Sequence, residues 1–257
     1  LPDWSWWLKW CKERKNKYPT VLAEYKNSRL VNPYYFMQML TRLVDAKTVI
    51  VAGNASACVI LFQASIVKKN QRIFWNSGCA SMGYDLPAAI GACLANNKKS
   101  TICIVGDGSI NMNIQELQTI VHYRLPLKIF VLNNKGYISI KQTQENFFGL
   151  PYIGCDKKSG VSFPSFLKIA KAYGIKAERI SGHKGMAEKI NKVLKFKGPV
   201  LCDVRLVPNY NFSPRLSSEK TQDGRIVSKS LEDMFPFLDR NEFKANMLVP
   251  LLDKADS

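Results

Sequence analysis

Short β-branched runs alternate with apolar residues at helical spacing along most of the chain. Helical spacing occurs near residues 33–44, 56–68, 86–96, 113–124, 163–173 and 184–197. The runs that predict strands are residues 48–52, 72–75, 101–105, 127–132, 175–180 and 200–206. Strands that are apolar on both faces and alternate with helices are typical of a parallel sheet covered on two sides. The pattern therefore predicts an α/β fold, a doubly wound parallel sheet of about six strands.

The two ends of the chain depart from this pattern. Residues 1–31 hold four of the five tryptophans, and a single amphipathic helix cannot bury that much aromatic surface by itself. We expect this segment to be a linker helix or the tail of a preceding domain. Residues 208–257 are richer in proline, serine and charge and are expected to form a tail or a lid. Residues 32–207 are the predicted sheet domain.

Composition excludes some classes of protein. The chain has 257 residues and a net charge of +17, but its lysines are spread along it, so a solvated basic surface is favoured over nucleic-acid binding. No apolar run is long enough to span a membrane. The seven cysteines include no Cys-x-x-Cys pair and several lie in apolar runs, which favours free thiols in a reducing cytoplasm.

Polar motifs follow two neighbouring predicted strands. Gly-Asp-Gly-Ser, residues 106–109, follows the third strand, and Asn133-Asn134 follows the fourth. A right-handed crossover brings both strand ends to the same edge of the sheet, where open α/β folds bind their ligands. Asp107 and Asn134 are therefore expected to lie close together.

Their chemistry suits a metal-bridged diphosphate. Carboxylate and amide oxygens are ligands that Mg²⁺ prefers, and the Gly136 carbonyl could join them. The glycines beside Asp107 allow close approach of a phosphate, to which Ser109 and backbone amides could donate hydrogen bonds. The alternative is that Asp107 caps a turn and Asn134 forms a loop. Neither the dinucleotide-binding nor the P-loop glycine motif occurs.

Two motifs carry a resemblance to a known family. The "GDGS…LNN" pattern resembles the thiamine-diphosphate (ThDP) motif of ThDP-dependent 2-oxo-acid enzymes. Residues 76–95, "NSGCASMGYDLPAAIGACLA", are similar to the segment of acetolactate synthase-like proteins that faces the rings of the cofactor. The similarity runs from about residue 32 to residue 207 and identifies the C-terminal diphosphate-binding domain of that family.

The resemblance implies specific roles for residues of this chain. Mg²⁺ would be bound by Asp107, Asn134 and the carbonyl of Gly136. The Ala80 carbonyl would accept from the cofactor's 4′-amino group, and Met82 would hold the bent shape that allows the thiazolium carbon to lose its proton. The implied diphosphate contacts are Gly108, Ser109 and, in the loop after the first strand, Gly53, Asn54 and Ser56.

The implied function is that of a carboligase. The intact protein would decarboxylate a 2-oxo acid such as pyruvate and add the resulting enamine to a carbonyl acceptor, a second oxo acid or a keto-sugar. Thr143 follows Gln142 close to where acetolactate synthases have a tryptophan, so we expect a reshaped acceptor side. The alternatives are simple 2-oxo-acid decarboxylation, or a non-catalytic subunit with a regulatory or assembly role.

The chain is expected to hold only part of the active site. In this family an activating glutamate lies in a separate pyrimidine-binding domain, which no segment here can form because the predicted strands are all used. We therefore expect a C-terminal fragment or a split subunit, inactive alone and working as a homodimer or homotetramer. No certain catalytic residue is predicted in this chain. His183 is a candidate for proton transfer, and His122 is expected on the surface or in the core.

Overall fold

The structure is a computed structural model that describes residues 2–220 and 223–250. It divides into two compact units, residues 1–210 and 211–257, each of which is described by itself. The limits predicted from the sequence, 1–31, 32–207 and 208–257, remain predictions. No helix in the described residues is long and apolar enough to cross a membrane.

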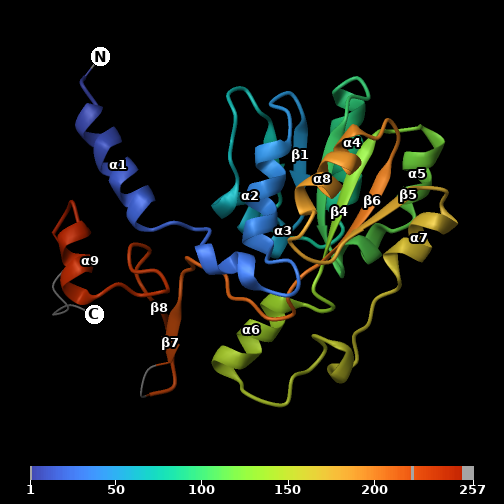
Figure 1. Ribbon diagram of the computed structural model, residues 1–257. Coiled ribbons are helices and arrows are strands. Elements are labelled where there is room, and N and C mark those ends of the chain that lie inside the picture. Colours follow the sequence, from blue (N-terminus) through green and yellow to red (C-terminus); the bar gives the residue numbers. More distant parts are fainter. Residues whose placement is uncertain (1, 221–222, 251–257) are drawn as a thin grey trace. The chain divides into compact units, whose positions relative to one another are not determined.

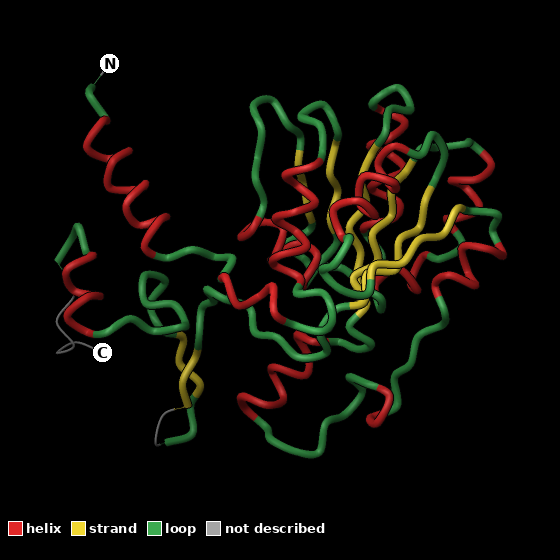
Figure 2. The backbone as a smooth tube through the Cα atoms, viewed as in Figure 1, coloured by secondary structure: helices red, strands yellow, loops and turns green. Residues whose placement is uncertain are grey.

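The first unit is built on a six-stranded parallel sheet (Figures 1 and 2). The strand order is β2-β1-β3-β4-β6-β5. Strand β2 lies on one side of β1 and strand β3 on the other, so the direction in which successive strands are added reverses between β1 and β3. This confirms the doubly wound α/β fold predicted from the sequence. The strands are β1 (Val49–Ala52), β2 (Ile73–Trp75), β3 (Thr101–Gly106), β4 (Leu127–Asn133), β5 (Lys176–Ile180) and β6 (Val200–Arg205).

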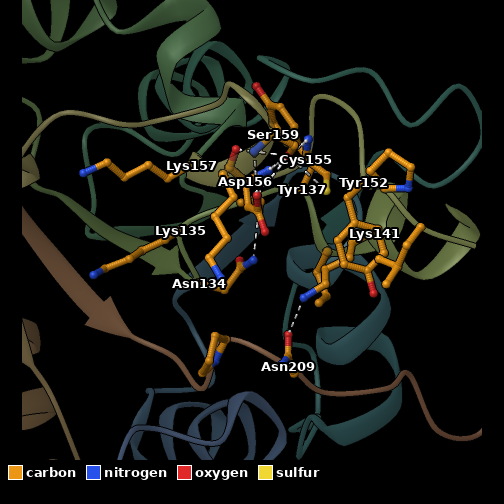
Figure 3. Close-up of a pocket in the computed structure, with 16 residues that line it drawn as sticks. Asn134, Lys135, Tyr137, Lys141, Tyr152, Cys155, Asp156, Lys157, Ser159 and Asn209 are labelled. Atoms are coloured by element: carbon orange, nitrogen blue, oxygen red, sulfur yellow. Dashed lines mark hydrogen bonds between the residues drawn. The ribbon is translucent and has the colours of Figure 1, made fainter. Parts of the chain in front are cut away.

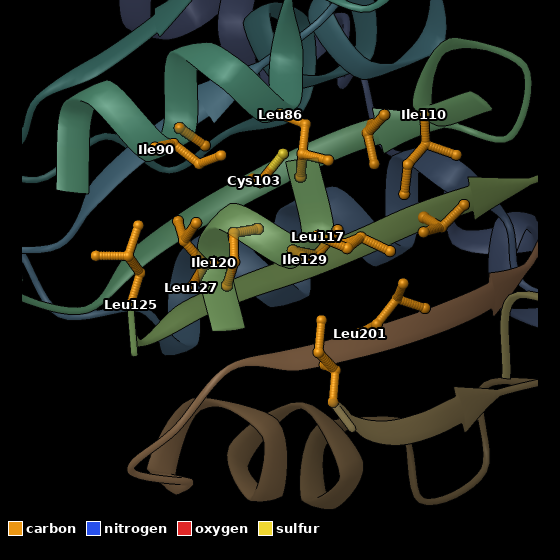
Figure 4. Close-up of a cluster of buried hydrophobic side chains, with 14 of the residues drawn as sticks. Leu86, Ile90, Cys103, Ile110, Leu117, Ile120, Leu125, Leu127, Ile129 and Leu201 are labelled. Carbon is orange, nitrogen blue, oxygen red and sulfur yellow. The ribbon is translucent and has the colours of Figure 1, made fainter. Parts of the chain in front are cut away.

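Helices cover both faces of the sheet because its central strands are apolar on both. Helices α4 (Asp85–Ala95), α5 (Glu116–His122) and α7 (Phe166–Ala172) pack on one face, and their side chains form a core cluster with Cys103, Ile129 and Leu201 (Figure 4). Alternate residues of the same strands face the other side. There they are covered by α2 (Pro33–Leu43), α3 (Ser56–Ala64) and α8 (Met186–Lys195).

The helix starts follow from local chemistry where the sequence carries a capping residue. The side chain of Asn32 accepts from the backbone N–H groups of Tyr34 (2.9 Å) and Tyr35 (3.2 Å), and Pro33 fills the first helical position of α2. The helix predicted over residues 113–124 corresponds to α5, which spans only residues 116–122. It begins later than predicted because the chain first forms a 3-10 turn, η2 (Ser109–Asn113). Helix α6 (Ile138–Phe147) was not predicted, since its buried residues are few.

The remaining elements lie outside the sheet. In the first unit these are helix α1 (Ser5–Lys17), which buries none of its residues, and two 3-10 turns, η1 (Ala23–Asn27) and η3 (Lys157–Ser159). The second unit contains an antiparallel pair, β7 (Ser218–Lys220) and β8 (Ile226–Ser228), and helix α9 (Arg240–Asn246). The strands and the helix of the second unit are short, which explains why the sequence of residues 208–257 shows no strand–helix period.

Candidate functional site

A cavity of about 100 Å³ lies at the carboxyl ends of β1, β3 and β4. The loops that follow these strands, the loop before α4 and the first turn of α6 form its walls. The structure brings most of the predicted site residues to this cavity, and Gly53 and Ala80 are not among those that line it. The predicted residues that line it are Asn54, Ser56, Met82, Asp107, Gly108, Ser109, Asn134 and Gly136.

Asp107 is a buried carboxyl group at the centre of the site. Asp107 is only 2% exposed, and its Oδ2 accepts a hydrogen bond from the backbone N–H of Lys135 at 2.6 Å. Burial raises the pKa of Asp107 to about 7. A bound cation would offset the cost of ionising this carboxyl group, so the environment fits a metal ligand.

The residues beside Asp107 add neutral oxygen donors. Asn134 Nδ2 donates to the carbonyl oxygen of Gly136 at 2.8 Å, so both residues are held at the same wall of the cavity. Carboxylate, amide and carbonyl oxygens together form a donor set suited to Mg²⁺. The described residues contain no cluster of three or more His, Cys, Asp or Glu side chains, so a metal here would depend on these amide and carbonyl oxygens.

Two glycines are needed because neighbouring groups come very close to the backbone. A Cβ atom at Gly108 would lie 2.1 Å from Cε1 of Tyr137, and one at Gly136 would lie 2.5 Å from the carbonyl oxygen of Cys155. Neither position has room for a side chain. Both glycines also line the cavity, so their peptide groups can face a phosphate bound there.

Asp85 is a second buried carboxyl group, which the sequence analysis missed. It is fully buried, and Ser109 Oγ donates to its Oδ2 at 2.5 Å while accepting from the Gly83 N–H at 2.8 Å. Burial raises the pKa of Asp85 to about 6. Because a hydroxyl has one hydrogen, Ser109 can offer a phosphate its backbone N–H but not its side-chain proton while it bonds Asp85. A Cβ at Gly53 would lie 2.2 Å from Asp85 Oδ2, which explains the glycine there.

The loop after β1 presents the start of α3 to the cavity. Ala55, the residue before the helix, has φ +46°, a conformation unusual for a residue with a side chain. Ser56 Oγ lies 2.6 Å from the hydroxyl oxygen of Tyr210, and Gln142 Nε2 donates to the Tyr210 carbonyl at 2.5 Å. Tyr210 therefore supports the predicted diphosphate loop, although nothing in the sequence pattern marked it.

Asn54, a predicted diphosphate contact, is bonded to Ala80, a predicted contact of the cofactor rings. Its Nδ2 donates to the carbonyl oxygen of Ala80 at 3.0 Å, across the gap between the loops after β1 and β2. Ala80 is exposed and has φ +50°. A carbonyl oxygen has two lone pairs, so Ala80 can still accept a second hydrogen bond. Met82 is half-buried and lines the cavity.

A wider cavity of about 590 Å³ shares four lining residues with the first, Asn134, Gly136, Tyr137 and Ile138 (Figure 3). Its far wall comes from α6 and the segment after it, and Lys141 Nζ donates there to Asn209 Oδ1 at 2.9 Å. Thr143, at the position expected to reshape the acceptor side, is exposed and lines neither cavity, and its Oγ1 donates to the Ser139 carbonyl of its own helix at 3.0 Å.

His183 has a structural role. Its Nε2 accepts from the Asn32 N–H at 2.9 Å, and Nδ1 lies 3.0 Å from the Lys26 carbonyl, to which it donates as a neutral tautomer. Both ring nitrogens therefore hold the segment before α2, and the residue does not line the cavity. These contacts give no support to a proton-transfer role for His183, which stays a prediction.

Comparison with known proteins gives the family. The family model described as thiamine pyrophosphate enzyme, C-terminal TPP binding domain, matches residues 52–204. The acetolactate synthase large subunit of Porphyra purpurea is 33% identical over 209 residues, which cover 80% of this chain and 34% of that protein. The chloroplastic acetolactate synthase of Arabidopsis thaliana is 31% identical over 235 residues, 87% of this chain and 35% of that protein.

These matches agree with the geometry of the cavity. The chain spans about a third of the length of the curated relatives that it matches. The family model covers the strands and loops that form the cavity, from the end of β1 to β6. The chain belongs to the acetolactate synthase-like branch of the thiamine pyrophosphate enzymes and carries their C-terminal TPP-binding domain.

Proposed function

We propose that this chain is the ThDP- and magnesium-binding part of a carboligase that decarboxylates a 2-oxo acid and joins the remaining fragment to a carbonyl acceptor. The observation that carries the proposal is the convergence of Asp107, Asn134 and Gly136 in one cavity with Met82. The curated relatives named above are acetolactate synthases, which supports the same class of reaction.

The residues of this chain would position the cofactor. The Asp107 carboxylate, the Asn134 amide oxygen and the Gly136 carbonyl would bind Mg²⁺, which in turn would bind the diphosphate. Backbone N–H groups at Gly108 and Ser109 and the N-terminal turn of α3 would donate to the phosphate oxygens. When bound, ThDP supplies the thiazolium carbon at which a 2-oxo acid loses CO₂ and from which the remaining fragment is transferred.

The wider cavity would receive the substrates. Its volume of about 590 Å³ lies within the range of small-molecule sites, and it opens beside the metal-binding residues. The Lys141 ammonium group in its wall can attract the carboxylate of a 2-oxo acid. We include a keto-sugar beside a second oxo acid as the acceptor because Thr143 replaces a tryptophan that the resemblance implies near this position, although Thr143 itself lines neither cavity.

The complete enzyme would need residues from outside this chain. The family's activating glutamate is expected on a pyrimidine-binding domain, and we propose that two or four subunits pair to bring it to the cavity. A cytoplasmic location remains a prediction from the cysteines. Simple decarboxylation would use the same residues without an acceptor, while a non-catalytic subunit would have no need to retain the Asp107 and Asn134 pair.

Analysis of the products that the complete enzyme forms tests this proposal. With ThDP, Mg²⁺ and pyruvate, we expect CO₂ release and a carboligation product whose formation depends on the added acceptor. An aldehyde as the sole product would support simple decarboxylation. If no CO₂ were released under conditions in which ThDP is bound, the chain would be a non-catalytic subunit.

A further inference from the structure

A third cavity, of about 400 Å³, lies at the carboxyl ends of β4, β5 and β6. None of the residues that line it also lines the 100 Å³ cavity of the cofactor site. Its walls come from the residues after β4, from η3 and the loop before α7, and from β5 and β6. The proposed cofactor chemistry leaves this cavity without a role.

The cavity has a strong excess of positive charge. Four basic side chains line it, and the single acidic residue among the lining is Asp203. The net charge of the lining is therefore +3. The basic residues are Lys135, Lys157, Arg179 and Arg205. We call them, with Asp203, the cationic cavity.

Asp203 bonds the guanidinium group of Arg179 and lies close to that of Arg205. It is 1% exposed, and its Oδ2 lies 3.1 Å from Nε of Arg179 and 3.9 Å from NH1 of Arg205. Oδ1 accepts from Nδ2 of Asn133 at 2.8 Å. One carboxylate cannot neutralise two arginines, and each guanidinium keeps N–H groups that are free to bind another anion. The arginine side chains are 42% and 27% exposed, so a ligand can reach them.

The two lysines add charge without a partner of their own. Within residues 2–220 and 223–250, neither ammonium group makes an ion pair or a hydrogen bond. Figure 3 shows Lys135 and Lys157 extending in the same direction, away from Lys141 and Tyr152. Lys135 has φ +62°, an unusual backbone conformation that lets its N–H bond Asp107 while its side chain lines the cationic cavity.

We propose that the cationic cavity binds a small molecule that carries a phosphate group. A phosphate dianion matches the excess charge, and arginine forks together with lysines are the side chains that bind such groups most strongly. The volume suits a metabolite, and the basic side chains gather around one cavity rather than along an extended groove, which favours a small molecule over a nucleic acid. This site is separate from the cofactor site and does not depend on the proposed function.

Calorimetric titration with inorganic phosphate tests the site. The parent chain is compared with Arg205→Gln and Lys157→Gln, with sodium chloride holding the ionic strength constant. Arg205 lines only the cationic cavity, whereas Lys157 also lines the 590 Å³ cavity. Lys99→Gln is the matched control, because it removes the same charge from an exposed position. Lys99 lies just before β3, at the amino ends of the strands, whereas the cationic cavity lies at their carboxyl ends.

We expect phosphate to bind the parent and the Lys99→Gln control equally, and both cavity variants about tenfold more weakly. Acetate should bind the parent more weakly than phosphate does. Arg205→Lys, which keeps the charge, should retain part of the affinity and shows that a loss is not due to misfolding. The proposal is overturned if the parent does not bind phosphate, if Arg205→Gln binds it as the parent does, or if Lys99→Gln loses as much affinity as the cavity variants.

Discussion

Replacing Asp85 with asparagine should change how the stability of the chain depends on pH. Asp85 is fully buried, and burial raises the pKa of its carboxyl group from 3.8 to about 6. The bond from Ser109 favours the ionised form but does not outweigh burial. Asparagine keeps the shape and an acceptor oxygen for Ser109, and it cannot ionise.

The size of the effect follows from the change in pKa. A shift of one pKa unit between the unfolded and folded states corresponds to about 1.4 kcal/mol, so a rise from 3.8 to about 6 changes the free energy of unfolding by about 3 kcal/mol. Because the folded state binds this proton more tightly than the unfolded state, the contribution of Asp85 is fully present below pH 3.8. It is lost as the pH rises to about 6 and changes no further above that.

The free energy of unfolding is measured by urea titration between about pH 3.5 and 7.5. This range brackets the pKa values of Asp85 in the unfolded and the folded state. Subtracting the curves of the parent and Asp85→Asn removes the contributions of groups common to both, Asp107 included. The free energy of unfolding of the parent should fall relative to the variant by about 3 kcal/mol across the window. Asp45→Asn, at an exposed position, controls for the loss of charge. A constant offset between parent and Asp85→Asn at every pH would refute the reasoning.

Two further substitutions test the site and its support. Gly108→Ala should weaken ThDP binding at least about tenfold in calorimetry, because the new Cβ would lie 2.1 Å from Tyr137 and displace it. The control is Gly91→Ala, at an exposed position of helix α4 where a Cβ meets nothing within 4 Å, and equal affinities of the Gly108→Ala variant and the parent would contradict the expectation. His183→Ala should lower the free energy of unfolding by about 1–3 kcal/mol in urea titrations, because the backbone N–H of the buried Asn32 loses its acceptor, whereas the carbonyl of the exposed Lys26 can bond water instead. Unchanged unfolding would mean that the histidine does not hold the segment before α2.

The sheet could be predicted because its signals are local. The apolar runs that became β1 to β6 are bounded by glycine, proline and charged residues, and their length rules out helices. The convergence of Asp107 with Asn134 also followed from the sequence, because the handedness of a crossover is nearly invariant. The cavity that contains both residues agrees with that expectation.

The parts that could not be predicted depend on contacts between residues distant in the chain. Asp85 opens α4, so in the sequence it resembles an ordinary helix-starting residue, and only the fold reveals its contacts with Ser109 and Gly53. Tyr210 reaches Ser56 across 154 positions of sequence. Ala55 adopts a left-handed backbone conformation that alanine does not signal.

The most direct test of the central claim is calorimetric titration of ThDP with and without Mg²⁺, on the parent chain and on Asp107→Ala. The account predicts that the parent binds ThDP only with Mg²⁺, and that the variant loses this binding, because it lacks the buried carboxylate that would bind the metal. Circular dichroism of the variant confirms that it is folded. Equal, magnesium-dependent binding by a folded Asp107→Ala variant would contradict the assignment of the metal site.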